Sequence, residues 1–204
     1  MAYFLKAFTR WLSKNNPSFK KFSHFCFWKP LLHVKKRYLC HKKYMGQDSK
    51  VISEDAKVWI YPASRKFYEQ EIEGLEEKIQ GFLKHWSQND SPIESSYTLK
   101  YNRFIVIFTD PNVSLGKEAI DKMVAFVLQL QKDYDLELLD KMNACFKQGP
   151  HVQYKSLVDF KKLIKDKAVN KNTLVFDNLI SSKYEFDHFW EVPACESWYK
   201  NFFK

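Results

Sequence analysis

The clearest pattern of apolar and polar positions in the chain lies between residues 97 and 111. Apolar and polar side chains alternate from Tyr97 to Asn102, and an unbroken apolar run, Phe104–Phe108, follows them. Such a run is typical of a strand that is buried on both of its faces. The Asp110-Pro111 pair marks its end, because proline cannot donate to a strand ladder. We therefore predict one strand over about 97–110, at the centre of a mixed sheet.

Two longer segments, residues 69–86 and 117–134, repeat apolar residues at intervals of three and four. This spacing gathers the apolar side chains on one face of a helix, which then packs on a sheet. A third helix is predicted for about 156–167, where Ser156 and Asp159 resemble a capping box with Asp in place of the usual Glu or Gln.

Shorter apolar runs predict the remaining strands. They lie at 58–61, at 174–176, and at 142–147 and 151–154, which Gly149-Pro150 joins as a hairpin. Pro193 is expected at the first position of a last short helix. Strands and helices in this order predict an α+β protein, with a single domain over residues 45–204 and about three to four helices packed on the mixed sheet.

Charge divides the chain near residue 44. Residues 1–44 hold 11 of the 33 Lys and Arg residues and no Asp or Glu, so the net charge of +9 comes from this basic, aromatic leader. Residues 45–204 hold 22 basic and 24 acidic side chains. Clustered cations favour nucleic acid through counterion release, and we therefore expect no nucleic acid partner for residues 45–204.

Three interpretations of the leader stay open. It is a segment that lies on an anionic membrane surface, a targeting peptide, or a segment that is not made because translation starts at Met45. Its apolar part, about residues 22–34, is too short and too charged to span a bilayer. Abundant Phe and Lys without Gly, Asp or Glu favour the start at Met45. We expect residues 1–44 to be disordered or not translated.

The four cysteines are scattered, which is typical of reduced thiols in a cytoplasmic protein. Within the leader, Cys26, His33, Cys40 and His41 match no known zinc-finger spacing, so no metal site is expected. Cys145 lies in an apolar strand and is expected to be a buried small side chain.

Five short motifs occur in a fixed order along the chain. They are Val58–Tyr61 with Ala63-Ser64-Arg65, Lys100–Ile105, Met142-Asn143, Val175–Leu179 and Trp190–Trp198. From about residue 50 to the C-terminus, this order resembles a family of small Bacteroidota proteins commonly catalogued as ABC-transporter ATPases. That family carries a Gly-Cys-Ser-Ile-Asp run where this chain has Lys117–Asp121, so chemistry based on that cysteine is not expected here.

The ATPase label that this resemblance implies requires a phosphate-binding loop, G-x-x-x-x-G-K-[ST], after a strand. Gly116-Lys117 is the only Gly-Lys pair in the sequence. Glu118 follows it instead of Ser or Thr, and Pro111 occupies the position of the first glycine. The sequence therefore has no P-loop, and no ABC signature is present either.

Four residues are candidates for binding a ligand: Arg65, Asn102, Arg103 and Asp110. Arginine can bind a carboxylate or phosphate through two parallel hydrogen bonds. Asp110 follows the central strand at its carboxyl end, where open α/β sheets place their ligands. The structural alternatives are an ion pair or helix cap for the arginines, and turn formation for Asn102 and Asp110.

A dense motif near the C-terminus contains Trp190, Glu191, Glu196 and Trp198. It predicts either a surface for a partner or aromatic side chains that hold the tail on the core.

Catalytic chemistry is not indicated, because the sequence shows no catalytic triad, Walker A motif or metal motif. We expect no cofactor and a non-catalytic binding or interaction module in the cytoplasm, with a protein partner or a small anionic ligand. The alternative is an enzyme or binder that acts on a nucleotide or phosphate, which requires Arg65, Arg103 and Asp110 to converge on one pocket. A membrane-peripheral partner of a transporter is a third hypothesis and needs the leader.

Overall fold

The computed structural model describes residues 53–203. The leader, the start at Met45 and the candidate zinc ligands lie outside the described residues.

Strand β5 (Phe104–Thr109) is the centre of a three-stranded antiparallel sheet, between β1 (Lys57–Pro62) and β4 (Ser95–Lys100). All six side chains of β5 are buried, as the apolar run predicts. The prediction of one strand over about 97–110 is wrong, because a hairpin occupies this stretch. Tyr101 and Asn102 take φ values of 57° and 47°, and Arg103 N donates to Lys100 O at 3.0 Å, the pattern of a type I′ turn.

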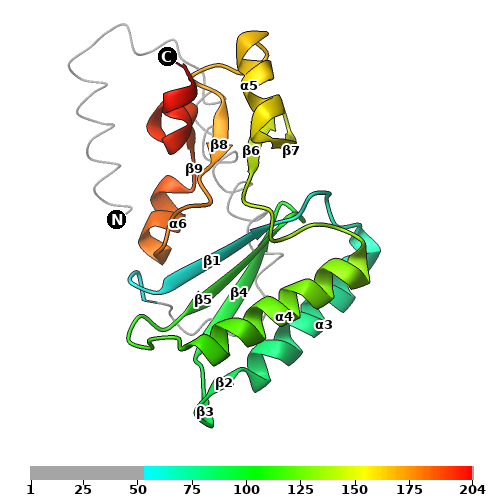
Figure 1. Ribbon diagram of the computed structural model, residues 1–204, viewed down its shortest axis with the longest axis vertical. Helices are drawn as coiled ribbons and strands as arrows, with labels where there is room; N and C mark the ends of the chain where they lie inside the picture. Colours follow the sequence, from blue (N-terminus) through cyan, green and yellow to red (C-terminus); the bar gives the residue numbers. More distant parts are fainter. Residues whose placement is uncertain (1–52, 204) are drawn as a thin grey trace, which may run out of the picture. The chain divides into compact units, whose positions relative to one another are not determined.

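Helices α3 (Glu69–His85) and α4 (Lys117–Tyr134) cover one face of this sheet (Figure 1). Both helices agree with their predicted ranges. Their buried side chains, among them Leu75 and Met123, pack against Ile105 and Ile107 of β5. The rings of Phe82 and Phe126 stack at 4.2 Å between the two helices.

The other face of β5 packs against a second antiparallel sheet with the order β7-β6-β8-β9. Phe104 and Val106 share one core cluster with Cys145 and Trp190 from this side. The strands are β6 (Asn143–Gln148), β7 (His151–Ser156), β8 (Leu174–Phe176) and β9 (Glu191–Pro193). The expected hairpin at 142–154 and the strand at 174–176 are therefore confirmed.

A third apolar cluster lies between the second sheet, α5 (Leu157–Lys165) and the short 3-10 helix η4 (Trp198–Phe203). The predicted cap of α5 is confirmed, because Ser156 Oγ accepts a hydrogen bond from Asp159 N at 3.1 Å. Pro193 ends β9 and is the residue before the 3-10 helix η3 (Ala194–Glu196), whereas the prediction placed it at the first position of the helix. The pattern missed α6 (Lys183–Phe189) and a hairpin of two short strands, β2 (Ser87–Gln88) and β3 (Ser91–Pro92).

The predicted class, a single α+β domain, is confirmed. The mixed sheet is wrong, because every strand pair in the described part of the chain is antiparallel. The sequence order of strand and helix allowed parallel crossovers, but the chain forms hairpins instead. Among residues 53–203, no helix has the length and apolar content needed to cross a membrane.

Candidate functional site

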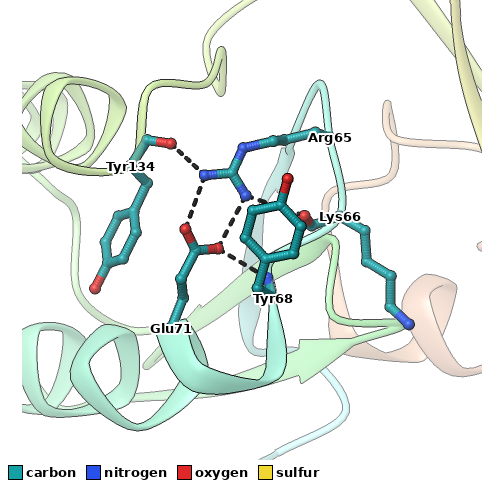
Figure 2. Close-up of polar contacts among 5 residues, drawn as sticks. All are labelled: Arg65, Lys66, Tyr68, Glu71 and Tyr134. Carbon is teal, nitrogen blue, oxygen red and sulfur yellow. Dashed lines mark hydrogen bonds and ion pairs between the residues drawn. The ribbon is translucent and has the colours of Figure 1, made fainter.

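Arg65, one of the predicted anion-binding residues, is fully engaged in a structural cluster (Figure 2). Its Nη1 donates to Glu71 Oε2 at 2.9 Å and to Lys66 O at 3.1 Å. Its Nη2 donates to Glu71 Oε1 at 2.9 Å and to Tyr134 O. The carboxylate of Glu71 also accepts a hydrogen bond from Tyr68 N at 2.8 Å. Arg65 thus joins the first turn of α3 to the last carbonyl of α4.

This arrangement follows from helix chemistry. The first amides of a helix need acceptors, and Glu71 supplies one, whereas a cation favours the last carbonyls of a helix. Hydrogen bonds from Arg65 hold the pKa of Glu71 below its usual value. Because both terminal nitrogens of Arg65 are used, its guanidinium has little left for a ligand. The structure favours the ion pair over the anion site at this position.

Arg103 differs from Arg65 because it has no acidic partner among the described residues. Its Nη1 donates to Ala63 O at 2.8 Å and to Ser64 O at 3.0 Å, while its Nε and Nη2 donate to no described residue. The side chain is half-buried, and burial lowers the pKa of its guanidinium. Cys145 and Tyr154 are close enough to interact with it electrostatically.

The groups around Arg103 are polar and neutral, or already hydrogen-bonded. Tyr154 OH donates to Asp140 Oδ2 at 3.0 Å, and burial raises the pKa of this phenol. Cys145 Sγ lies 3.7 Å from Asn143 Oδ1, and burial raises the pKa of the thiol to about 12. Cys145 is therefore the buried small side chain that the sequence predicts, and its thiol stays protonated at neutral pH.

Asp110 lies at the far end of β5 from Arg103. The two ends of a strand of this length are about 20 Å apart, so Asp110 and Arg103 share no pocket. Asp110 Oδ1 accepts a hydrogen bond from Asn112 N at 2.7 Å, as expected of a turn former. Asn102 is also a turn residue, and its carbonyl accepts a hydrogen bond from Phe67 N at 2.7 Å. The expected convergence of Arg65, Arg103 and Asp110 is wrong.

The C-terminal motif is mostly internal. Trp190 is 4% exposed, packs against Phe104 and Phe176, and donates from Nε1 to Asn178 Oδ1 at 3.0 Å. The ring of Trp198, which is half-buried, stacks at 4.0 Å on buried Tyr199. These aromatic side chains hold the tail on the core, which is the structural alternative for this motif.

The two acidic residues of the motif have separate environments. Glu191 accepts hydrogen bonds from Tyr101 OH and from Lys147 Nζ, and the ammonium group of Lys147 lies 4.8 Å from the centre of the Tyr101 ring. Glu191 thus joins the β4–β5 turn to the second sheet, while Glu196 is exposed.

Exposed aromatic side chains occur just before this motif, on α6. Tyr184 is 46% and Phe189 51% exposed, and the rings of Tyr184 and His188 stack at 4.4 Å. Sequence reasoning missed this surface because it missed α6. The available signal was the capping box of Ser182 and Glu185.

An open, shallow depression of about 480 Å³ lies beside the turn after β1. It is lined by Ser64 and by residues from the end of α4 and the segment that follows, namely Gln131, Lys132, Asp135, Leu136 and Glu137. Across the described residues, no cluster of three or more His, Cys, Asp or Glu side chains has an arrangement that would hold a metal ion.

No family model, curated protein or solved structure matches the chain.

Proposed function

We propose that this chain is a non-catalytic binding module that accepts an anionic group, a carboxylate or a phosphate, at Arg103. The observation that supports this function is the half-buried guanidinium of Arg103, which keeps Nε and Nη2 free of described partners. Withdrawing a cation from water is costly unless an anion compensates it. Two backbone carbonyls compensate only one of its nitrogens.

The neighbours of Arg103 favour binding over catalysis. A general acid or base needs a pKa near the working pH. Burial instead moves the pKa values of Tyr154 and Cys145 upward, away from neutral pH. The guanidinium of Arg103 recognises an oxyanion by hydrogen bonding without reacting with it, whereas the hydroxyl of Tyr154 already donates to Asp140.

The remaining expectations fit this proposal. A nucleotide would bind through its phosphates at Arg103 and not at a P-loop. The resemblance to the Bacteroidota family stays a prediction. A cytoplasmic location is consistent with scattered thiols, and a protein that carries an exposed carboxylate is as suitable a partner as a small molecule.

A thermal-shift titration of the full chain tests the proposal. The ligands are pyrophosphate, citrate and Mg-ATP, with a neutral sugar as the control. A ligand at 100 times its Kd adds about 2.7 kcal/mol, which corresponds to roughly 5–10 °C for a domain of this size. We expect a saturable shift with at least one anion, which Arg103→Gln abolishes and Lys141→Gln, at an exposed lysine, retains.

Each shift is measured relative to the unliganded variant, so a loss of stability in Arg103→Gln does not affect the comparison. A saturable shift of equal size in Arg103→Gln would place the anion elsewhere on the chain. The absence of any shift with all three anions would refute the anion site.

A further inference from the structure

Strand β4 forms an open edge of the first sheet. β5 pairs with one side of β4, and no strand in the described part of the chain pairs with the other side (Figure 1). All six side chains of β4 are half-buried, whereas three of the six in β7, an outer strand of the second sheet, are exposed. β1, the other outer strand of the first sheet, is partly paired, because Val58 N donates to Ser181 O at 3.0 Å. A covered but unpaired edge such as that of β4 is a site for a further strand.

The hydrogen bonds just before β4 show which of its backbone groups point away from β5. Asp110 N donates to Glu94 O at 3.2 Å, so the backbone groups of Glu94 point toward β5. Ile93 points the other way, because its N–H donates to Trp86 O at 2.9 Å. These directions alternate along an antiparallel strand. The backbone N–H and C=O groups that face the open edge therefore belong to Ser95, Tyr97 and Leu99.

Two side chains on one face of β4 lack a partner among residues 53–203. The hydroxyl of Ser96 is buried and makes no hydrogen bond. Half-buried Lys100 makes no hydrogen bond or ion pair, and burial lowers its pKa. The nearby carboxylates of Asp187 and Glu191 are already paired with other lysines. Buried polar groups are normally satisfied, so both side chains indicate a partner along this edge.

A second copy of β4 fits this edge in an antiparallel arrangement about a two-fold axis. With the axis at Tyr97, the Tyr97 residues of the two copies lie opposite each other. Ser95 then lies opposite Leu99 of the second copy, and the reverse. All three outward residues of each copy form backbone hydrogen bonds in this register, because each meets an outward residue of the other copy.

The same register matches the side chains on the face of β4 toward α6. Ser96 comes opposite Thr98 of the second copy, and hydroxyl pairs of this kind stabilise neighbouring strands. Lys100 comes opposite Glu94 of the second copy, so unlike charges meet at both ends of the strand pair. β4 contains no other charged side chain, and the pairing therefore brings no like charges on the strands together.

Charges on α3 are compatible with the same axis. Gln80 Nε2 donates to Tyr97 OH at 2.8 Å, which places this part of α3 beside the axis. Glu76 and Lys84 lie one turn before and one turn after Gln80, on the same side of the helix. The axis makes α3 antiparallel to its copy, so Glu76 lies on the side of Lys84 of the second copy. Unlike charges then face each other twice across the axis.

We propose that the chain forms a two-fold homodimer through β4, in which the two three-stranded sheets become one continuous antiparallel sheet. The backbone of Ser95, Tyr97 and Leu99 supplies the pairing, and the hydroxyl and charge pairs select the register. This interface is independent of the anion site at Arg103.

Sedimentation equilibrium of the full chain measures the association. We expect the mass to rise with concentration from that of one chain toward that of two. Thr98→Lys brings two lysines close together near the axis and should raise the dissociation constant by about tenfold or more. The matched control is Gln153→Lys, at a half-buried position of β7, which should leave the dissociation constant unchanged. The urea midpoint of each variant shows whether it remains folded.

Disulfide cross-linking tests the register. The background chain has Cys26, Cys40 and Cys195 replaced by Ser, and Cys145 is buried. Ser96→Cys and Thr98→Cys are made in separate chains, which are mixed and oxidised. Directly opposite residues of a non-hydrogen-bonded pair have Cα atoms about 4.5 Å apart, which suits a disulfide. We expect a disulfide between the two variants, identified by peptide mapping, and much less within either variant alone.

Four results would each overturn the proposal. They are the mass of one chain at every concentration, an unchanged dissociation constant in folded Thr98→Lys, no disulfide between the two cysteine variants, and as much disulfide within each variant as between them. The first result would leave the β4 edge to a strand from a different protein.

Discussion

The ion pair between Arg65 and Glu71 is expected to stabilise the fold, and the size of the effect can be worked out from its geometry. Two parallel hydrogen bonds of 2.9 Å join the side chains, whose exposed fractions are 30% and 19%. Arg65 also donates to the carbonyls of Lys66 and Tyr134. A partly buried pair of this kind contributes about 1–2 kcal/mol, and each backbone hydrogen bond about 0.5 kcal/mol. Arg65→Gln should therefore lower the free energy of unfolding by about 2–3 kcal/mol.

Urea unfolding measures this change as a lower midpoint with an unchanged slope. A double-mutant cycle with Glu71→Gln isolates the pair and should give a coupling energy of about 1–2 kcal/mol. The control is Lys162→Gln, because Lys162 and Asp159 are 67% and 52% exposed. A surface pair of this kind is worth about 0.5 kcal/mol or less. If Arg65→Gln cost no more than Lys162→Gln, the structural role of Arg65 would be refuted and the anion hypothesis would return for this residue.

Three further predictions address the same elements. The folded pKa of Glu71 lies below its usual value of 4.5, so the carboxylate stabilises the fold above that pH and this contribution is lost as the pH falls through the folded pKa. The difference in urea midpoint between the wild type and Glu71→Gln should therefore vanish in acid. Iodoacetamide should label exposed Cys195 in the folded protein and leave Cys145 unlabelled, because burial raises the pKa of Cys145 to about 12. Peptide mapping measures the labelling of each cysteine, and equal labelling of Cys145 and Cys195 would contradict the burial of Cys145. Asn102→Gly should keep the stability and any anion binding of the wild type. Asn102→Val should lower the free energy of unfolding by about 1–3 kcal/mol, because a β-branched residue is strained at a φ of 47°. Loss of anion binding in Asn102→Gly would show that the Asn102 side chain contacts the ligand.

Local periodicity was sufficient to predict the elements that are long or buried on both faces. The apolar stripes of α3 and α4 and the apolar run of β5 show which side chains of each element are buried, without information from the rest of the chain. The turn at Tyr101 and Asn102 escaped prediction because it lacks the usual Gly, so its positive φ values were not visible in the sequence. α6 escaped because its seven residues are too few to show a period.

Sheet pairing was not predictable in the same way. A strand-helix-strand order is compatible with a parallel crossover or with separate antiparallel hairpins. In this chain the choice depends on contacts between distant residues, such as Val106 with its partners Ile60 and Thr98 on the two neighbouring strands. The resulting antiparallel sheet has no carboxyl-end crevice of the kind that was expected to place Asp110 at a ligand site.

Arg65 and Arg103 are the same type of residue, but they have different partners and therefore different roles. Arg65 follows β1 and Arg103 precedes β5, at the same end of the first sheet, and a guanidinium at either position can bind an anion. Glu71 lies in the first turn of α3, where it pairs with Arg65, whereas no described carboxylate is paired with Arg103. Arg103 instead holds the carbonyls of Ala63 and Ser64, and these contacts fix the guanidinium in place before any ligand arrives. A cation that is held in place and has no carboxylate partner among residues 53–203 loses little entropy on binding an anion, which is why Arg103, and not Arg65, is the residue on which the anion hypothesis now depends.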